Sequence, residues 1–156
     1  HCGAIPSLIA NFRVGKYIEE ASDFPLTYGN ITINNYNQHI VSSNEENENS
    51  LVLGFHLLKK DFLIMGDAPI AVEKVIMSEY ANIPCDILKV GHHGSNTSSS
   101  EAFIQYLHPQ EAVISVGFNY YGHPHDSVIQ TLEKYHIEIK RTDQMGTIDY
   151  FNYIFM

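Results

Sequence analysis

Residues 91–97 place two adjacent histidines between two glycines, in the segment GHHGSNT. The segment follows the apolar run DILKV, whose composition is typical of a buried strand. Glycines on both sides allow a sharp turn and a close approach of the backbone to a substrate. We therefore expect His92 and His93 to carry chemistry at the end of a strand. The alternative is that both histidines are ordinary turn residues.

Polar residues also follow three further predicted strands, where a strand that served only the core would simply turn. They are Asp67 in FLIMGD, His123 and His125 in NYYGHPH, and Arg141, Thr142 and Asp143 in IEIKRTD. If these strands share one sheet, their ends can converge on one rim of it. Imidazole nitrogens together with a carboxylate suit zinc or manganese. The pattern is therefore typical of a metal site.

The same residues also have structural alternatives. Asp67 could cap a helix that begins at Ala68, a role that is compatible with metal binding. Arg141 and Asp143 could form a surface ion pair of little energetic weight. The segment around His123 could be an ordinary loop. Four further histidines lie within predicted strands or at helix ends, where a structural role is the better explanation: His39, His56, His108 and His136.

Hydrophobic periodicity and capping residues predict where the elements lie. Helices are expected at residues 5–12, 68–81, 98–107 and 126–136, the last two capped by Ser98 and Asp126. Strands are expected at residues 31–36, 38–43, 50–58, 61–67, 86–90, 112–117, 137–142 and 147–155, with a polar acidic loop at 44–50. The first half is thus rich in hairpins, and the second half alternates strand and helix. This mixture predicts an α/β (α+β) fold with helices on the outer faces of sheets.

The bulk composition limits the classes of function. The chain has 156 residues and a formal charge of −9, which fits one domain and argues against a broad basic surface for nucleic acid. The charge leaves room for a site where bound cations reverse the local field. Cys2 and Cys85 could form one bridge or remain two free thiols. The sequence has no run of about 18 apolar residues, so no transmembrane helix is expected.

Five segments together resemble the metallo-β-lactamase-fold domain of ComEC-type DNA-internalisation proteins. They are NSLVL, FLIMGD, DILKVGHHGSNTSSSEAFIQYLHPQEAVISVG, NYYGHPH and RTDQMGTI. The match runs from residue 1 to about 148 in order, spacing and the residues around the histidines. It implies an αββα sandwich formed by a single domain over 1–156. It also implies an extracytoplasmic location, next to the rest of a membrane DNA-internalisation protein.

The resemblance extends to the first residues of the chain. HCGAIPSL is similar to the tail of a histidine- and aspartate-rich metal motif, with His1 as its final histidine and Ala4 in place of a common glycine. The chain also begins with histidine rather than methionine. We therefore expect an N-terminally truncated domain that exposes apolar sheet surface and tends to associate with itself.

The resemblance implies a role for each site residue. Asp67 is expected to bridge two divalent ions, zinc or manganese, and His123 to be the last histidine ligand. His92 or His93 is expected to be a ligand or a proton donor, and which ring does which stays open. Substrate contacts are expected from a further set, in which the first two stand where other members place a metal-binding histidine: Asn49, Ser50, Ser95, Arg141 and Asp143.

The expected function is that of a metal-dependent hydrolase, a phosphodiesterase or nuclease that acts on DNA during competence uptake. Two ions about 3.5–4 Å apart would lower the pKa of a shared water. A histidine of the 92–93 pair would then protonate the leaving alkoxide. One alternative is a hydrolase of a small phosphoester, similar to a phosphocholine esterase. The other is an inactive fragment that only associates with a partner.

Overall fold

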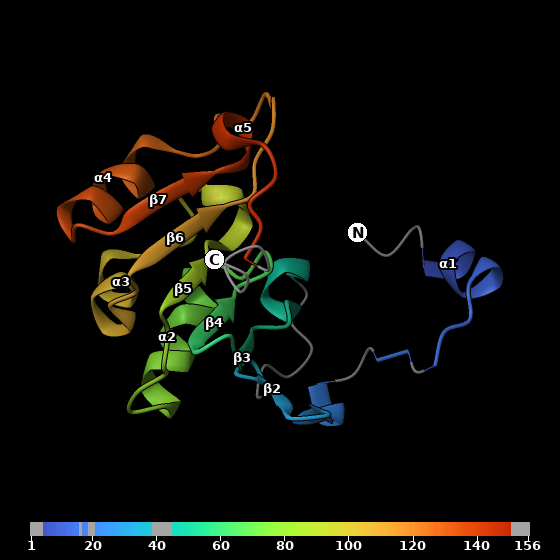
Figure 1. The fold of residues 1–156 in the computed structure, drawn as a ribbon. Helices are drawn as coiled ribbons and strands as arrows, with labels where there is room; N and C mark the ends of the chain where they lie inside the picture. Colours follow the sequence, from blue (N-terminus) through green and yellow to red (C-terminus); the bar gives the residue numbers. More distant parts are fainter. Residues whose placement is uncertain (1–4, 16, 19–20, 39–44, 151–156) are drawn as a thin grey trace.

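The computed structural model describes residues 5–15, 17–18, 21–38 and 45–150, and these residues form one seven-stranded sheet (Figure 1). The strands follow one another across the sheet in chain order. They are β1 (Leu26–Tyr28), β2 (Ile31–Asn35), β3 (Leu53–Leu57), β4 (Lys60–Ile64), β5 (Ile87–Lys89), β6 (Glu111–Ile114) and β7 (Glu138–Arg141). Strands β1 to β4 pair antiparallel, whereas β4 to β7 pair parallel.

Parallel neighbours need a crossover connection, and helices supply it between β4 and β7. Helix α2 joins β4 to β5, α3 joins β5 to β6, and α4 joins β6 to β7. The described helices are α1 (Ile5–Asn11), α2 (Ile70–Glu79), α3 (Glu101–Leu107), α4 (Asp126–Lys134) and α5 (Thr142–Met145), with 3₁₀ turns η2 (Ala21–Asp23), η3 (Glu46–Asn49) and η4 (Gly91–Gly94).

The main core lies between the parallel strands and the helices α2, α3 and α4 (Figure 1). Each helix contributes one apolar stripe to it, such as Ile76 of α2, Phe103 of α3 and Leu132 of α4. Alternate strand residues such as Leu63 and Leu88 point into the same core, because side chains alternate across a strand. The core therefore fixes the parallel strands relative to one another.

The opposite face of the sheet carries a smaller group of apolar side chains. Phe62 and Ile87 are buried there. Phe62 stacks on Phe55 with 5.2 Å between ring centroids and meets the ring of Tyr150 edge-on at 5.4 Å. The described residues place no second sheet on this face. The mixed α/β class is confirmed, but the αββα sandwich implied by the resemblance is not confirmed and stays a prediction.

Most of the predicted elements are confirmed, with ends displaced by a few residues. One prediction falls largely outside the described residues: of the strand at 38–43, only Gln38 is described. Within 147–155, the described residues 147–150 form no strand. Two short elements, β1 and α5, were not expected. No helix in the described part of the chain is long and apolar enough to cross a membrane.

Both predicted helix caps were wrong by one or two residues. The N-cap of α3 is Ser100 rather than Ser98, and its side chain accepts a hydrogen bond from the amide of Phe103. The N-cap of α4 is His125 rather than Asp126, and its ring accepts from the amide of Ser127. In both cases a contact with another segment, Glu73 of α2 for Ser100 and Gly94 for His125, accompanies the choice among several suitable residues.

Candidate active site at the carboxyl edge of the sheet

The loops that follow β4, β5, β6 and β7 leave the sheet at one edge, which we call the carboxyl edge. Asp67 follows β4, His92 and His93 follow β5, His123 lies in the loop after β6, and Arg141 ends β7. Ligands of open α/β sheets bind outside the carboxyl ends of the strands for this topological reason. The prediction that these strand ends meet at one rim is confirmed.

A carboxylate and an imidazole face each other at the centre of this edge. Oδ1 of Asp67 lies 3.6 Å from Nε2 of His93. The other ring nitrogen of His93, Nδ1, lies 2.7 Å from the carbonyl oxygen of Ser115. A carbonyl can only accept, so Nδ1 carries the proton and donates it. In the neutral ring, Nε2 therefore presents its lone pair on the side of Asp67.

Two further histidine rings complete the group. The ring of His92 lies 5.6 Å from that of His123 and 6.5 Å from that of His93, measured between centroids. Burial lowers the pKa of His123, and the neighbouring imidazoles lower it further when they are protonated. His123 is therefore neutral at pH 7, which is the state in which an imidazole can ligate a metal ion.

The two glycines of GHHG are required by the packing of the loop. A Cβ at Gly91 would lie 3.0 Å from the carbonyl oxygen of Ala68, and one at Gly94 would lie 2.7 Å from Cβ of Pro124. Gly94 also has a positive φ of 81°. The close approach to Pro124 brings the loop after β6, with His123, against the loop after β5.

The histidines themselves are held in a strained backbone conformation. His92 has φ 45° and ψ 44°, and His93 has φ 56° and ψ 23°, so both are left-handed. Residues other than glycine adopt this region rarely, and strain of this kind concentrates at functional sites. The amide of His92 donates to the carbonyl of Gly66 at 3.0 Å, which ties the loop to the segment that carries Asp67.

A buried carboxylate supports the loop from behind. Glu73 of α2 is 1% exposed, and its two oxygens accept hydrogen bonds from the amides of Ser99 and Ser100. Burial raises the pKa of Glu73, while these hydrogen bonds oppose the shift. Next to them, the hydroxyl of Ser98 donates to the carbonyl of Gly91 at 2.7 Å. Helix α2 thus positions the start of the GHHG turn.

A lysine lies beneath the aspartate. Nζ of Lys89 in β5 lies 3.4 Å from the carbonyl oxygen of Gly66. Burial lowers the pKa of Lys89, and the charge of Asp67 opposes that shift. The ammonium group of Lys89 therefore places a positive charge close to the carboxylate of Asp67.

Three of the predicted substrate residues precede β6 in the chain, and they differ in how close they lie to the site. Ser50 lies at the site, because its hydroxyl accepts from the amide of Asp67 at 3.3 Å. Its neighbour Asn49 is exposed at the end of η3. Ser95 is buried and its hydroxyl lies 3.0 Å from that of Thr97, so it lies inside the GHHGSNT loop.

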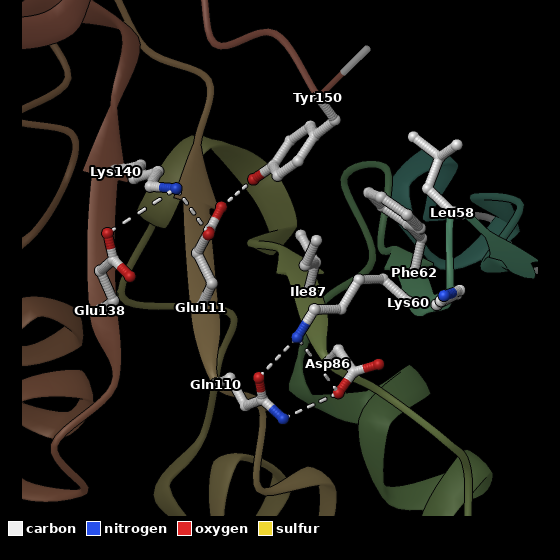
Figure 2. A pocket seen from close by; sticks show the side chains of 11 residues that line it. Leu58, Lys60, Phe62, Asp86, Ile87, Gln110, Glu111, Glu138, Lys140 and Tyr150 are labelled. Carbon is white, nitrogen blue, oxygen red and sulfur yellow. Dashed lines mark hydrogen bonds and ion pairs between the residues drawn. The ribbon is translucent and has the colours of Figure 1, made fainter. Parts of the chain in front are cut away.

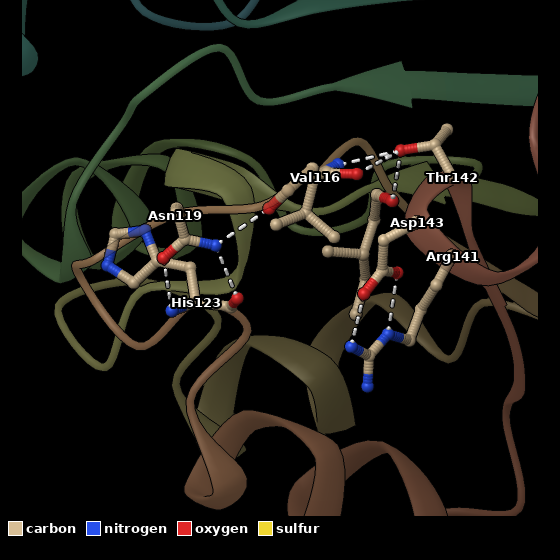
Figure 3. A network of polar contacts seen from close by, with 8 residues as sticks. Val116, Asn119, His123, Arg141, Thr142 and Asp143 are labelled. Atoms are coloured by element: carbon tan, nitrogen blue, oxygen red, sulfur yellow. Dashed lines mark hydrogen bonds and ion pairs between the residues drawn. The ribbon is translucent and has the colours of Figure 1, made fainter.

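Arg141 and Asp143 bind each other at the end of β7 (Figure 3). Nε of Arg141 donates to Oδ1 of Asp143 at 3.0 Å, and Nη2 donates to Oδ2 at 2.7 Å. The hydrogen bond from Arg141 lowers the pKa of Asp143. Thr142 between them binds both the amide and the carbonyl of Val116, which joins β7 to the loop after β6. The predicted phosphate contact is thus bound to a carboxylate in this structure.

The donor atoms fit part of a metal site. Asp67 and His93 supply a carboxylate and an oriented imidazole, and the hydrogen bond from the far nitrogen to a carbonyl is typical of histidine ligands. Among the described residues, no three His, Cys, Asp or Glu side chains gather closely enough to hold an ion by themselves. His1, the remaining predicted ligand, lies outside the described residues.

Three residues of the edge were missed by sequence reasoning. Lys89 interrupts the apolar strand DILKV, and Glu73 falls within the apolar stripe of α2. A charged residue at an otherwise apolar position of a strand or helix could have indicated a role at the site. Asn119, which binds the backbone of the loop after β6, gave no signal beyond its place in a turn-rich stretch.

Comparisons with known proteins give three relatives, and no family model matches the chain. ComE operon protein 3 of Bacillus subtilis is 45% identical over 106 residues, or 67% of this chain. Competence protein ComA of Neisseria gonorrhoeae is 34% identical over 108 residues, or 68% of the chain. Recombination protein 2 of Haemophilus influenzae is 34% identical over 111 residues, or 70% of the chain.

These matches support a competence-related family. The matched region spans 14% of the first and third relatives and 16% of the second, so each relative is much longer than the segment that it shares. None of the three names refers to a metallo-β-lactamase domain, so that part of the resemblance stays a prediction.

Proposed function

We propose that this chain forms part of a metal-dependent phosphodiesterase that cleaves DNA during competence-related DNA uptake. The observation that carries the proposal is the pair formed by Asp67 and His93, with the imidazole fixed by Ser115 so that Nε2 lies on the side of the carboxylate. The names of the relatives, which refer to competence and recombination, favour DNA as the substrate.

Each residue of the carboxyl edge has a part in this proposal. Asp67 and His93 would hold a divalent ion, zinc or manganese, and His123, the further imidazole ligand expected from the resemblance, would have to move closer to reach the same ion. When bound, such an ion supplies Lewis acidity and an activated water. The pair of ions expected from the resemblance needs donors beyond the described residues. The imidazole of His92, near the hydroxyl of Thr97 at 3.5 Å, would give a proton to the leaving oxygen.

The charge of the chain agrees with an enzyme that grips phosphate locally. A formal charge of −9 repels a DNA backbone over most of the surface. Contacts with phosphate would therefore concentrate at the bound ion, at Lys89 and at Arg141. Arg141 would contact phosphate through its guanidinium fork, which suits phosphate oxygens as well as it suits Asp143.

The test measures hydrolysis of single-stranded DNA and of bis-p-nitrophenyl phosphate by the natural full-length protein, with manganese or zinc. Asp67→Asn is expected to lower both rates by at least about a hundredfold and to reduce the metal content found by elemental analysis. Asp86→Asn is the matched control, because Asp86 lies at the other end of β5 and is expected to leave both rates unchanged.

The outcomes separate the alternatives. Equal rates in the wild-type protein and in Asp67→Asn would contradict the proposed site. Metal-dependent hydrolysis of bis-p-nitrophenyl phosphate without cleavage of DNA would show a hydrolase of small phosphoesters. Absence of metal and of both activities in the full-length protein would mean that this edge serves association with a partner.

A further inference from the structure

Three aromatic side chains stand in solvent beside the candidate site. Phe118 is 90% exposed, Tyr120 is 93% exposed and Tyr121 is 84% exposed. All three lie in the loop after β6, within five residues of His123. An exposed cluster of large apolar rings is unfavourable in water and is typical of a binding surface.

The loop that carries these rings is held closed by one residue. Asn119 donates from Nδ2 to the carbonyls of Gly117 and His123, at 2.9 and 2.8 Å (Figure 3). Its Oδ1 accepts from the amides of Tyr121 and His123, at 3.1 and 3.0 Å. The amide of Asn119 thus occupies the inside of the turn, and the aromatic neighbours are directed outward. The hydrogen bonds of Asn119 therefore fix the loop in a conformation that exposes the three rings.

The aromatic loop and the histidines share one cavity. It has a volume of about 390 Å³, and its lining includes His93, His123, Phe118 and Tyr121. The rings of Tyr121 and His123 stack at 5.9 Å between centroids, with an angle of 28°. The volume is within the range of about 300–1,000 Å³ that is typical of small-ligand sites. A phosphodiester bound at the histidines would thus place its neighbouring base next to the rings of Phe118 and Tyr121.

We propose that Phe118, Tyr120 and Tyr121 stack the unpaired bases of single-stranded nucleic acid next to the phosphodiester that is cut. The inference rests on the proposed function and adds its substrate class. Stacking on aromatic rings binds any base through its π face and does not need a basic surface, which suits a chain with a charge of −9. Paired bases are excluded, because their faces are covered by neighbours in the duplex.

Binding is measured with the natural full-length protein in the presence of a chelator, so that the result does not depend on hydrolysis. The probe is a fluorescent oligo(dT), and the reference is an abasic oligomer of the same length. Phe118→Ala with Tyr121→Ala is expected to weaken binding of oligo(dT) by about tenfold or more and to leave binding of the abasic oligomer unchanged. Tyr28→Ala is the control, because Tyr28 is 87% exposed and lies in the outermost strand β1, and it is expected to change the binding of neither oligomer.

Unchanged binding of oligo(dT) by the double variant would overturn the inference. If the double variant instead keeps its binding of oligo(dT) but no longer binds vesicles of phosphatidylcholine and phosphatidylglycerol, the inference is overturned and the aromatic loop contacts a membrane. If Asp67→Asn leaves hydrolysis unchanged, the proposed function fails, while the binding measurement still decides the role of the aromatic loop.

Discussion

The two edges of the parallel sheet differ in how their polar groups are used. The amino edge, where β4 to β7 begin, holds the larger cavity, of about 690 Å³ (Figure 2). Its polar side chains bind one another: Lys60 to Gln110, Gln110 to Asp86, Lys140 to Glu111, and Tyr150 to Glu111. At the carboxyl edge, the smaller cavity gathers histidines on glycine-bounded, strained turns.

The two cavities differ in what holds their polar side chains in place. At the amino edge, opposite charges meet at short range, so the groups neutralise each other and stabilise the fold. At the carboxyl edge, the backbone holds the side chains: the carbonyl of Ser115 holds the ring of His93, and the carbonyl of Gly66 holds the amide of His92. We infer that the amino edge serves stability and the carboxyl edge serves function.

The largest effect is expected from Gly94→Ala at the carboxyl edge. The added methyl group would lie 2.7 Å from Cβ of Pro124, and the position has a positive φ, so the loop with His123 has to move. A displacement of about 1 Å at a catalytic group can lower a rate about a hundredfold, and we expect a loss of that order in hydrolysis of bis-p-nitrophenyl phosphate.

Gly117→Ala is the matched control for this substitution. Gly117 lies in the same loop, but a Cβ there has no neighbour within 4 Å and its φ is not positive. The Gly117→Ala variant is expected to hydrolyse bis-p-nitrophenyl phosphate at the wild-type rate. Equal losses in the two variants would mean that the loop tolerates no change of any kind, and the specific fit of Gly94 against Pro124 would be wrong.

The parallel half of the fold could be predicted because its signals are strong and local. DILKV and AVISVG are short apolar runs bounded by turn residues, and the helix between them has apolar residues at helical spacing, Phe103, Ile104 and Leu107. Strand β1 could not be predicted in this way. It has three residues, Leu26–Tyr28, in a stretch bounded by Pro25 and Gly29, and its pairing with β2 supplies the strand geometry.

The caps show where local chemistry is insufficient. Residues 98–100 are three consecutive serines with equal capping ability. The choice of Ser100 is made by Glu73, which binds the amides of Ser99 and Ser100 from another helix. His125 displaces Asp126 for a similar reason, because its amide is already bound to the carbonyl of Gly94.

The candidate site was predictable in its residues but not in its supports. Asp67, His92 and His93 closely follow strand ends, which parallel order brings together, whereas His123 lies further along the loop after β6 and is brought in by the packing of Gly94 against Pro124. The partners that hold them come from packing: the carbonyl of Ser115, the lysine of β5 and the carboxylate of α2. The sequence carries the types of these residues but not the contacts that give them a role.

A smaller effect, on stability alone, is expected from Lys140→Met at the amino edge. The side chains of Lys140 and Glu111 are 15% and 12% exposed and lie 2.6 Å apart. Removal of the lysine leaves the largely buried carboxylate of Glu111 without its cation, with the hydroxyl of Tyr150 still bound to it, which is expected to lower the free energy of unfolding by about 2 kcal/mol. Urea denaturation measures this loss, and the rate of hydrolysis below the transition is expected to be unchanged.

Lys134→Met tests whether burial is the cause. Lys134 pairs with Glu101 at the surface, where the two side chains are 61% and 53% exposed. Removal of an exposed pair of this kind has little effect on stability. A loss of activity in Lys140→Met, with the fold retained, would show that the amino edge takes part in function and would break the comparison between the edges.

The smallest effect is expected from a thiol reagent at Cys85, two residues before the start of β5 at the amino edge. Burial, with the charges of Asp86 and Asp61 adding to it, raises the pKa of the Cys85 thiol to about 12. At pH 8 only about one thiol in ten thousand is then a thiolate, which is the reactive form. In a Cys2→Ser background, iodoacetamide is therefore expected to leave the native protein unlabelled at pH 8 and to label it after unfolding in urea.

The sign of the pH effect follows from the same shift. Because the pKa in the folded state is higher than in the unfolded chain, the native protein holds this proton more tightly. The contribution of this thiol to stability is complete below about pH 9 and is lost as the pH rises from about 9 to about 12. A Cys85→Ala variant in the same background should lack this part of the loss. Rapid labelling of the native protein at pH 8 would show an open amino edge, and the assignment of that edge to stability would then be wrong.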